Sequence, residues 1–535
     1  MRALLAGLAC ALAACSALES YQEDTGGECG TGKPVCVLPN ASASCVNFAC
    51  VVSRCNDGYS DCDLAAANGC ETNTARDPNN CEVCGRACRV STEDNVLASV
   101  CDKACLAVCA PGFGDCDAEY ANGCEANLSG DERNCGTCGN PCPGSCVNGE
   151  CVAVIGIYGS ASSTHACALL STGTAKCWGN DGSGQLGDSA TSCGTPCVKT
   201  SAQAVTSLAG TPLSGIATLA TGGQHTCAIV GDGTVMCWGS NDHGQLGIGG
   251  ADSGYHGVPY TVQAPAPTKF AALALGKAHS CALTDQGAVW CWGDNGAGQS
   301  GSDPSNATVP APALVNGLPS IAALDAGIDF TCAVDSNGGV WCWGNDSNNQ
   351  LGDGAGAKPA VFSPVRMSVG KTSAVSCGST ATCVLLGNAV SCTGLSAEGQ
   401  LGLGSTTQVQ VPTPADSTDG GAPTFSSLQL GADHACAIAT DALESSYGAL
   451  WCWGGNEHAQ LFAPPPPSSF NVPLVVGAVD DTVQVLTGSN FTCVLTKVDG
   501  TVRCVGDDSL GQLGLGTGPD GDVHALPAVP VAGLL

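Results

Sequence analysis

One segment of this chain recurs seven times. Residues 222–247 read GGQHTCAIVGDGTVMCWGSNDHGQLG, and the second cysteine of this segment returns at intervals of 50 to 60 residues. The glutamine near its end returns at the same intervals, so the register between cysteine and glutamine is constant. A period near fifty residues is typical of a propeller or a repeat array. The second cysteines and their glutamines are Cys177 and Gln185, Cys237 and Gln245, Cys291 and Gln299, Cys342 and Gln350, Cys392 and Gln400, Cys452 and Gln460, and Cys504 and Gln512.

Each copy contains two short runs rich in β-branched residues on either side of a glycine-containing turn, which predicts a β-hairpin. A spacing of ten residues places two cysteines opposite each other across a symmetric hairpin, where a disulfide can form. Cys193 and Cys197 form a further local pair, which leaves Cys377 as the odd cysteine. The predicted hairpin disulfides are Cys167/Cys177, Cys227/Cys237, Cys281/Cys291, Cys332/Cys342, Cys383/Cys392, Cys436/Cys452 and Cys493/Cys504.

The run CWGSNDHGQLGIG, with the Gly-x-x-His-Ser/Thr segment before it, resembles the regulator of chromosome condensation repeat family. Thr393 and Val505 replace the tryptophan of this pattern, Ser300 replaces the leucine of the Gly-Gln-Leu-Gly turn, and Phe462 replaces its last glycine. The resemblance covers residues 152–535 and implies an all-β, seven-bladed β-propeller. One eukaryotic branch of the family promotes nucleotide exchange on a small nuclear GTPase and other members are interaction platforms, so the resemblance leaves the function open.

Repetition also indicates whether the histidine and the tryptophans of the motif are functional or structural residues. The histidine before the first cysteine occurs in four copies (165, 225, 279 and 434) and is Phe330, Ala381 or Phe491 in the others. A catalytic residue is needed once, so we interpret this histidine as structural and expect it to bond a backbone group within its own blade. All eight tryptophans lie in the same segments, and we expect them to fill the space between adjacent sheets.

Residues 29–151 form a different, cysteine-rich module that contains a duplication. CNDGYSDCDLAAANGCE from Cys55 matches CAPGFGDCDAEYANGCE from Cys109, and each copy holds eight cysteines. Even groups predict closed disulfide sets, whose connectivity the sequence does not give. Zinc at the CxxC pairs is the less favoured alternative in an exported chain.

Carboxylates next to NGCE in both copies allow two interpretations. They are solvated turn residues, or they bind calcium, which prefers oxygen ligands, although the spacing is not that of an EF-hand loop. The calcium interpretation places the ion at Asp61, Asp63, Asp115 and Asp117. No other cofactor is expected.

The composition and the N-terminus predict export. The chain has 535 residues, 39 cysteines and a net charge of −30; so many cysteines suit an oxidising compartment. MRALLAGLACALAACS has signal-peptide features, and residues 12–15 resemble the bacterial lipobox. We therefore expect a lipoprotein signal peptide at 1–14, a lipid on Cys15, an acidic tether at 15–28 and attachment to the outer membrane; otherwise the chain is periplasmic or secreted.

The charge balance argues against nucleic acid as a partner and against a nuclear exchange factor. We expect a non-enzymatic binding or scaffold lipoprotein, anchored by its lipid alone, whose propeller rim loops recognise an extracellular protein or glycan. The alternative from a different class is a secreted lyase or glycosidase, which would need a unique polar cluster at the central channel. The second alternative is regulation of a GTPase by nucleotide exchange, as in the eukaryotic branch.

The segment 188–200, DSATSCGTPCVKT, is the candidate binding loop. The gap between a Gly-Gln-Leu-Gly turn and the next Gly-x-x-His segment is longest here, and a CGTPC ring would order the loop before a partner binds. Its candidate contact residues are Ser192, Gly194, Thr195 and Pro196; a tolerated surface insertion is the alternative interpretation. The closing segment 525–535, ALPAVPVAGLL, is expected to pair with the start of the first repeat and so to close the ring.

The lipobox resemblance leads to a first prediction. Cys15→Ser should move the protein from the membrane to the soluble fraction, because the sequence offers no second apolar anchor. Fractionation of cells that express each form measures this shift. Unchanged membrane retention of the variant would contradict the lipoprotein interpretation.

Overall fold

The computed structural model describes residues 36–535 except 48, 66, 90–94, 191–196, 267, 416–423, 441–447, 465–466, 478, 480, 498 and 518–522. The predicted signal peptide, Cys15 and the tether therefore lie outside the described residues. The chain divides into two compact units, one of residues 1–142 and 146–151 and one of 143–145 and 152–535. Among the described residues, no helix has the length and apolar character needed to span a membrane.

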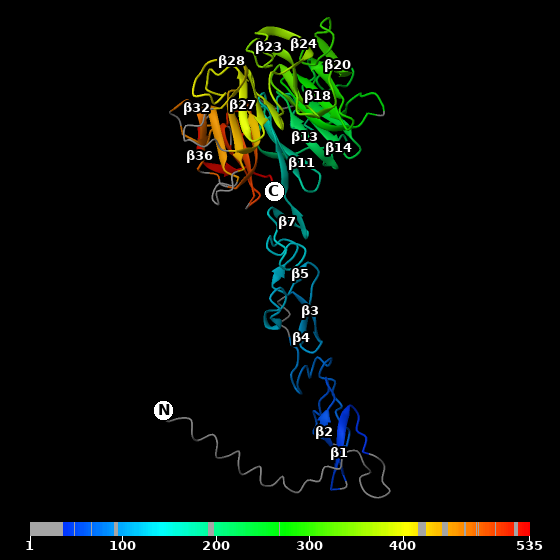
Figure 1. The fold of residues 1–535 in the computed structure, drawn as a ribbon. Coiled ribbons are helices and arrows are strands. Elements are labelled where there is room, and N and C mark those ends of the chain that lie inside the picture. The colour runs from blue at the N-terminus through cyan, green and yellow to red at the C-terminus, as the bar shows by residue number, and fades with distance from the viewer. Residues whose placement is uncertain are drawn as a thin grey trace, which may run out of the picture. The chain divides into compact units, whose positions relative to one another are not determined.

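The cysteine-rich module is built from small two-stranded sheets rather than around a large core (Figure 1). Its two copies have the same disulfide connectivity: first to third, second to fifth, fourth to seventh and sixth to eighth cysteine. All CxxC cysteines are in these disulfides, so none is a free zinc ligand. The elements are β1 (Ala41–Val46), β2 (Ala49–Cys55), β3 (Val96–Cys101), β4 (Cys105–Cys109), β5 (Phe113–Gly114), η1 (Tyr120–Asn122), β6 (Ala126–Asn127), β7 (Ser145–Val147) and β8 (Glu150–Val152).

The second unit is a seven-bladed propeller, as the sequence predicts, and each blade is a four-stranded antiparallel sheet of consecutive strands. Blades 1 to 3 consist of β9 (Val154–Tyr158), β10 (His165–Leu170), β11 (Ala175–Asn180), β12 (Val198–Ala204); β13 (Ile216–Thr221), β14 (His225–Val230), β15 (Thr234–Gly239), β16 (Tyr260–Thr261); and β17 (Phe270–Leu275), β18 (His279–Thr284), β19 (Val289–Asp294), β20 (Thr308–Leu314).

Blades 4 to 7 continue this order around the disc (Figure 1). They consist of β21 (Ile321–Ala326), β22 (Phe330–Asp335), β23 (Val340–Asp346), β24 (Lys358–Arg366); β25 (Ala374–Cys377), β26 (Ala381–Leu386), β27 (Ala389–Gly394), β28 (Val409–Pro414); β29 (Phe425–Leu430), β30 (His434–Ala439), β31 (Leu450–Gly455), β32 (Ser469–Val475); and β33 (Thr482–Thr487), β34 (Phe491–Thr496), β35 (Val502–Asp507), β36 (Val523–Pro530).

A disulfide joins the two middle strands of every blade. Cys227 and Cys237 are register partners in β14 and β15, with a Cα–Cα distance of 4.1 Å. The same distance occurs in the other six hairpins, including the three with a different turn length. Cys377 is buried and is the free cysteine among the described residues. Cys197 is disulfide-bonded, whereas Cys193 lies outside the described residues.

Adjacent blades are joined through buried tryptophans. The Nε1–H of Trp238 in blade 2 donates to the carbonyl of Gln185 in the turn of blade 1, at 2.9 Å. Matching bonds of 2.8 to 3.0 Å come from Trp292, Trp343, Trp453 and Trp178. These five rings are fully buried. Because a buried indole N–H needs an acceptor, each bond determines how one blade meets the next.

The two departures from the motif at the junction of blades 6 and 7 compensate each other. In five of the other six turns the last glycine lies directly against the indole of the next blade, and a Cβ added at Gly187 would be 2.7 Å from Nε1 of Trp238. In the sixth, Gly352 faces Thr393, which replaces the tryptophan of blade 5. Blade 7 carries Val505 in place of that tryptophan, and Phe462 replaces the glycine in the turn of blade 6. Both side chains are buried in one cluster, so the phenylalanine supplies the volume that the indole supplies elsewhere.

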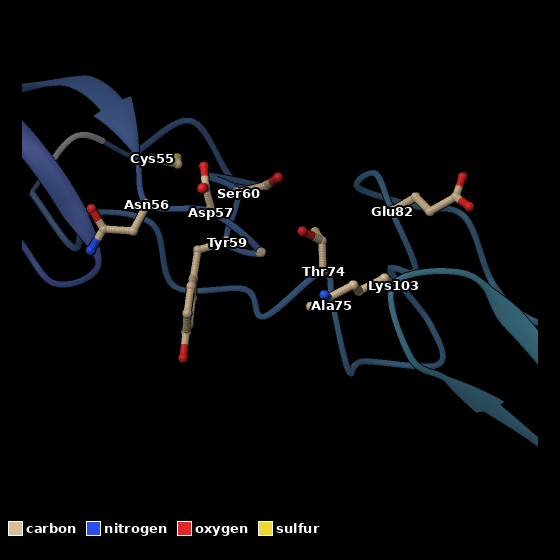
Figure 2. Close-up of a pocket in the computed structure, with 10 residues that line it drawn as sticks. Cys55, Asn56, Asp57, Tyr59, Ser60, Thr74, Ala75, Glu82 and Lys103 are labelled. Atoms are coloured by element: carbon tan, nitrogen blue, oxygen red, sulfur yellow. The ribbon is translucent and has the colours of Figure 1, made fainter.

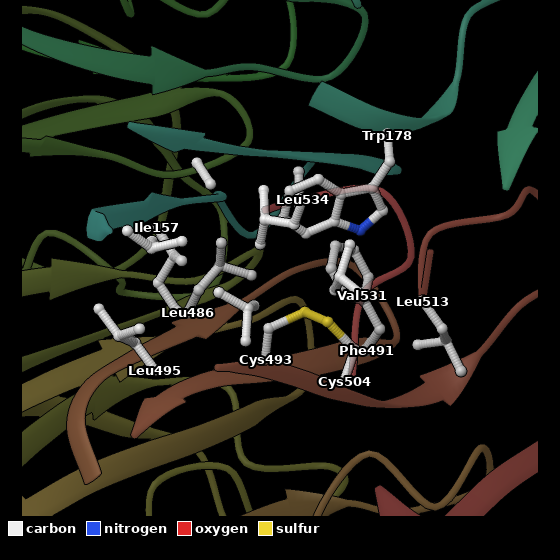
Figure 3. Close-up of a cluster of buried hydrophobic side chains, with 14 of the residues drawn as sticks. Ile157, Trp178, Leu486, Phe491, Cys493, Leu495, Cys504, Leu513, Val531 and Leu534 are labelled. Atoms are coloured by element: carbon white, nitrogen blue, oxygen red, sulfur yellow. A yellow bond between two sulfur atoms is a disulfide. The ribbon is translucent and has the colours of Figure 1, made fainter. Parts of the chain in front are cut away.

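The ring closes differently from the expectation for the last segment. Strand β36 pairs with β35 as the outer strand of blade 7, not with the start of blade 1. Residues after β36 reach blade 1: Ala202 N–H donates to the carbonyl of Ala532, at 2.9 Å. Val531 and Leu534 pack with Trp178 in a buried cluster (Figure 3).

The inner strands complete this junction. The amide of Gln484 in β33 accepts from Ile157 N–H at 3.0 Å and donates to Ile157 C=O at 2.7 Å. One side chain thus pairs with the backbone of β9 as a short strand would. Ring closure depends on this bond, the Trp178 bond and the C-terminal residues rather than on strand exchange.

Removing residues 531–535 should therefore weaken the junction of blades 7 and 1 while all seven sheets stay complete. The lost burial of Val531 and Leu534 is worth about 3 to 6 kcal/mol, so we expect a lower melting temperature and a greater tendency to aggregate. Calorimetry and light scattering of the full chain and of the chain ending at Pro530 measure both effects. The control is deletion of Leu535 alone, which is 42% exposed. Equal melting of all three forms would contradict this closure.

Candidate binding surfaces

The Gly-Gln-Leu-Gly turns and the Gly-x-x-His segments define one face of the disc, which we call the Gln face. The turns between paired cysteines define the opposite, hairpin face. In all seven turns the glutamine Oε1 accepts the N–H two residues earlier, as Gln185 does from Ser183 at 2.8 Å. The invariant glutamine therefore stabilises its own turn and is not a free binding group.

The repeated histidine has a structural role, but its partner differs from the expectation. His225 Nε2 lies 2.8 Å from the hydroxyl of Ser280 in the next blade, and the described residues show no hydrogen bond from this ring to a backbone group of its own blade. The Ser280 hydroxyl in turn donates to the carbonyl of Gln245. Corresponding contacts link His165, His279 and His434 to hydroxyls of following blades. Burial lowers the pKa of His165, His225 and His434 to about 3 and that of His279 to about 4, so these rings are neutral at pH 7.

Unrepeated polar residues on the inner strands make contacts between blades. Asp325 in β21 accepts the N–H of Cys377 at 2.7 Å, and burial raises the pKa of this carboxyl to about 6. Ser376 in β25 accepts the N–H of Leu430 at 3.0 Å. Together with Gln484, these residues are unrepeated polar groups of the inner strands that take part in blade junctions.

A hollow of about 460 Å³ opens on the Gln face where several Gly-x-x-His segments meet. Its lining comes from blades 1, 2, 3, 4 and 7, and most of the contributing side chains differ from blade to blade. Lys277 is the cation in this lining. The lining residues are Ala161, Ser162, Thr164, Asn180, Gly223, Gln224, Ser240, Asp242, His243, Gln245, Lys277, Ala278, Ile328, Ser489 and Leu510.

The two faces differ in charge. Described loops and strand ends on the Gln face contain many carboxylates and three lysines, of which Lys199 and Lys358 form ion pairs of 3.2 Å with Asp188 and Asp353. The hairpin face is nearly balanced, with six basic and five acidic residues in the corresponding positions. The Gln-face carboxylates are Asp181, Asp188, Asp242, Asp252, Asp294, Asp303, Asp329, Asp346, Asp353, Glu398, Asp433, Glu457, Asp507 and Asp508.

The predicted binding loop is described in part, at residues 188–190 and 197–200. Ser192, Gly194, Thr195 and Pro196 lie outside the described residues, but the flanking Asp188 and Val198 lie on the Gln face. The sequence missed a neighbour of this loop: the hydroxyl of Tyr255 in blade 2 donates to the buried Asp181 of blade 1 at 2.8 Å. Burial and this carboxylate raise the pKa of Tyr255. No pattern in the sequence links two residues 74 positions apart.

The predicted calcium residues lie together in each copy of the cysteine-rich module. Carboxylate oxygens of Asp61, Asp63 and Glu71 lie within 4.8 Å of one another, and Asp115, Asp117 and Glu125 repeat this arrangement. Sequence reasoning missed the glutamates, although both end the repeated NGCE. Glu71 and Glu125 each accept the N–H of a disulfide-bonded cysteine, at 2.9 and 2.8 Å. Oxygen ligands of this kind suit calcium, and calcium binding stays a prediction.

The first copy also contains an open hollow of about 540 Å³ (Figure 2). Asp57, Tyr59, Glu82 and Lys103 are among its lining residues. Figure 2 shows Tyr59 and Glu82 pointing in different directions, so the polar groups do not converge on one point. We assign no binding role to this hollow.

Comparisons with known proteins agree with the propeller. The RCC1-like domain family matches residues 192–530, and the regulator of chromosome condensation (RCC1) repeat matches residues 159–185. The Ultraviolet-B receptor UVR8 of Arabidopsis thaliana is 30% identical over 68% of this chain and 79% of its own length. The probable E3 ubiquitin-protein ligases HERC3 and HERC4 of Homo sapiens are both 32% identical over 36% of this chain. The chain spans only 19% and 17% of those two ligases.

Solved structures share the fold at lower identity. Human WBSCR16 aligns with a TM-score of 0.58 and 19% identity over 67% of this chain and 94% of its own. Prp20p of Saccharomyces cerevisiae, described with its binding properties to Gsp1p and histones, aligns with a TM-score of 0.53 and 20% identity over 65% of this chain and 84% of its own.

The buried histidines predict a dependence of stability on pH. Their folded-state pKa values lie below the unfolded value of about 6.5, so the unfolded chain binds more protons and stability falls as the pH drops from 6.5 towards 3. His225→Phe, which copies Phe330 and Phe491, should cost about 1 kcal/mol at pH 7 through the lost hydrogen bond. It should also reduce the pH slope between 4 and 6 by about 1.4 kcal/mol per unit.

Melting curves of both proteins from pH 4 to pH 8 test this expectation. His243→Gln is the matched control, because His243 is exposed on the Gln face and should leave the slope unchanged. A slope for His225→Phe equal to that of the parent protein would contradict the assignment of a neutral, buried ring.

Proposed function

We propose, for a chain that belongs to the RCC1-like domain family, a non-enzymatic binding function at the cell surface. The propeller recognises an extracellular protein or glycan through rim loops on its Gln face. Lipid on Cys15 holds the protein at the outer membrane, and the cysteine-rich module connects this anchor to the propeller.

One observation carries this proposal: the Gln-face hollow gathers unrepeated side chains from five blades. The repeated glutamines, tryptophans and histidines are occupied within and between blades, so they do not distinguish one partner from another. The residues that vary, such as Gln224, Lys277 and Ser489, lie in the segments that surround the hollow. Recognition by variable loops on a rigid scaffold is a common use of such folds.

Charge indicates the kind of partner. The Gln face combines its many carboxylates with one lysine, Lys277, that forms no ion pair among the described residues. Such a face favours association with a partner that presents basic groups and disfavours polyanions. A protein of similar structure, Prp20p, is described with its binding to Gsp1p and histones. For this chain, recognition of a protein is our proposal.

The Gln face is tested by exchanging its candidate loop. Replacing residues 188–200 with the matching, shorter segment of blade 4 should weaken binding of a partner at least about tenfold, because the loop borders the face that the proposal uses. Melting temperature should change little, since the strand residues that are exchanged, 198–200, belong to the outer strand β12 and are only partly buried. The immobilised full chain first captures the partner, and calorimetry then compares the two forms.

A control variant makes this test specific to one face. Lys269→Gln removes an exposed charge from the hairpin face and should leave affinity unchanged. Equal affinity after the loop exchange, together with a loss in the Lys269 variant, would place the binding surface on the opposite face and overturn the proposal.

A further inference from the structure

A second cavity, of about 470 Å³, opens on the hairpin face of blade 4. The hairpin turn after β22, the strand β23, the end of β24 and the loop before β25 line it. Pockets that bind small ligands have volumes of about 300 to 1,000 Å³, so this cavity is large enough for one. Asp335, Trp341, Arg366 and Lys371 supply its charged and aromatic groups.

Trp341 differs from the other tryptophans at its repeat position. Trp290 in blade 3 and Trp451 in blade 6 occupy the same register, and both pack against buried hydrophobic clusters. Trp451 also contacts Phe425 edge to face, with ring centroids 6.3 Å apart. Trp341 belongs to none of the hydrophobic clusters of the described residues and lines the cavity instead. A large indole on a cavity wall leaves apolar ring surface for a ligand.

Asp335 holds this indole in place. Its Oδ2 accepts the Nε1–H of Trp341 at 3.0 Å, and its Oδ1 accepts the N–H groups of Asn337 and Gly339 at 2.8 and 2.9 Å. Burial acts to raise the pKa of Asp335, but these hydrogen bonds outweigh it and lower the pKa, so the group is a carboxylate. The indole N–H is therefore already used, and a ligand meets only the ring.

Two cations that form no salt bridge among the described residues complete the cavity, and one of them, Arg366, is attracted at longer range to Asp335 and helps lower its pKa. Arg366 is the register partner of Trp341 across β23 and β24, whereas blades 3 and 6 place Leu314 and Val475 at this position. Lys371 lies in the loop before β25, and both cations are exposed. Neither takes part in the ion pairs found among the described residues. Asp335 already spends its oxygens on Trp341 and on the backbone of the turn, so two exposed cations beside an indole, in a chain of net charge −30, favour an anionic ligand.

We propose that this cavity binds an anionic sugar residue of an extracellular glycan. The apolar face of the pyranose ring packs on the indole of Trp341, and a carboxylate or sulfate on the sugar accepts hydrogen bonds from Arg366 and Lys371. This site lies on the face opposite the proposed protein-binding surface and does not depend on it.

Titration calorimetry of the full chain tests the proposal with three probes: tetragalacturonate, a heparin tetrasaccharide and neutral maltotetraose. At least one acidic probe should bind about tenfold or more tightly than the neutral one. Preference for tetragalacturonate assigns the site to carboxylates, and preference for the heparin fragment assigns it to sulfates. Equal affinity for the neutral sugar, or no binding of either acidic probe, overturns the proposal, as does tighter binding of ATP than of both acidic sugars.

Variants locate the binding in this cavity. Arg366→Gln and Lys371→Gln should each weaken the acidic probe about tenfold with unchanged melting, because both side chains are exposed. Trp341→Leu should weaken it as well, and if this variant fails to fold the two cation variants decide. Lys269→Gln is the matched control, since Lys269 lies against the hairpin turn of blade 2 in the register of Lys371. Equal losses from Lys269→Gln and Lys371→Gln would show a general charge effect and overturn the site.

Discussion

The propeller depends on one hydrogen bond that recurs around the ring, from the indole of one blade to the turn carbonyl of the blade before it. The bond needs a turn of fixed shape, which the side chain of its glutamine provides through its own bond to the turn backbone. It also needs a residue without Cβ next to the indole, which the last glycine of the turn provides. Three residue types that look like separate signatures in the sequence therefore serve a single contact between blades.

This contact between blades explains which features of the fold could be predicted from the sequence and which could not. The blade count and the hairpin cysteine pairs follow from constant spacing, because a β-hairpin converts sequence distance directly into cross-strand register. The substitutions Val505 and Phe462 are 43 positions apart and look like two unrelated weaknesses in the sequence. In the structure they fill one volume. Contacts between blades bring together residues from different repeats, and a period alone does not show which of them meet.

Ring closure and the cysteine-rich module show the same limit. Strand β36 pairs with β35 instead of the first blade, and Gln484 forms hydrogen bonds to Ile157. Both contacts depend on the three-dimensional arrangement of the last repeat. The duplicated cysteines predict closed sets, yet a set of eight allows 105 connectivities. Both copies adopt the same connectivity, and in each copy a glutamate, Glu71 or Glu125, lies beside the two aspartates of that copy. The backbone turns that produce this arrangement are not specified by the cysteine spacing.

Repetition also indicates where to look for function. A residue that occurs in most blades and is occupied in a blade junction serves the scaffold, whether it is a histidine, a tryptophan or a glutamine. Residues that depart from their repeat equivalents without a structural partner are then the informative ones. Lys277 on one face and Arg366 beside Trp341 on the other satisfy this criterion, because equivalent positions in neighbouring blades carry uncharged residues. A scaffold of seven near-identical blades can hold two different binding surfaces only through such departures, since the shared residues present the same chemistry in every blade.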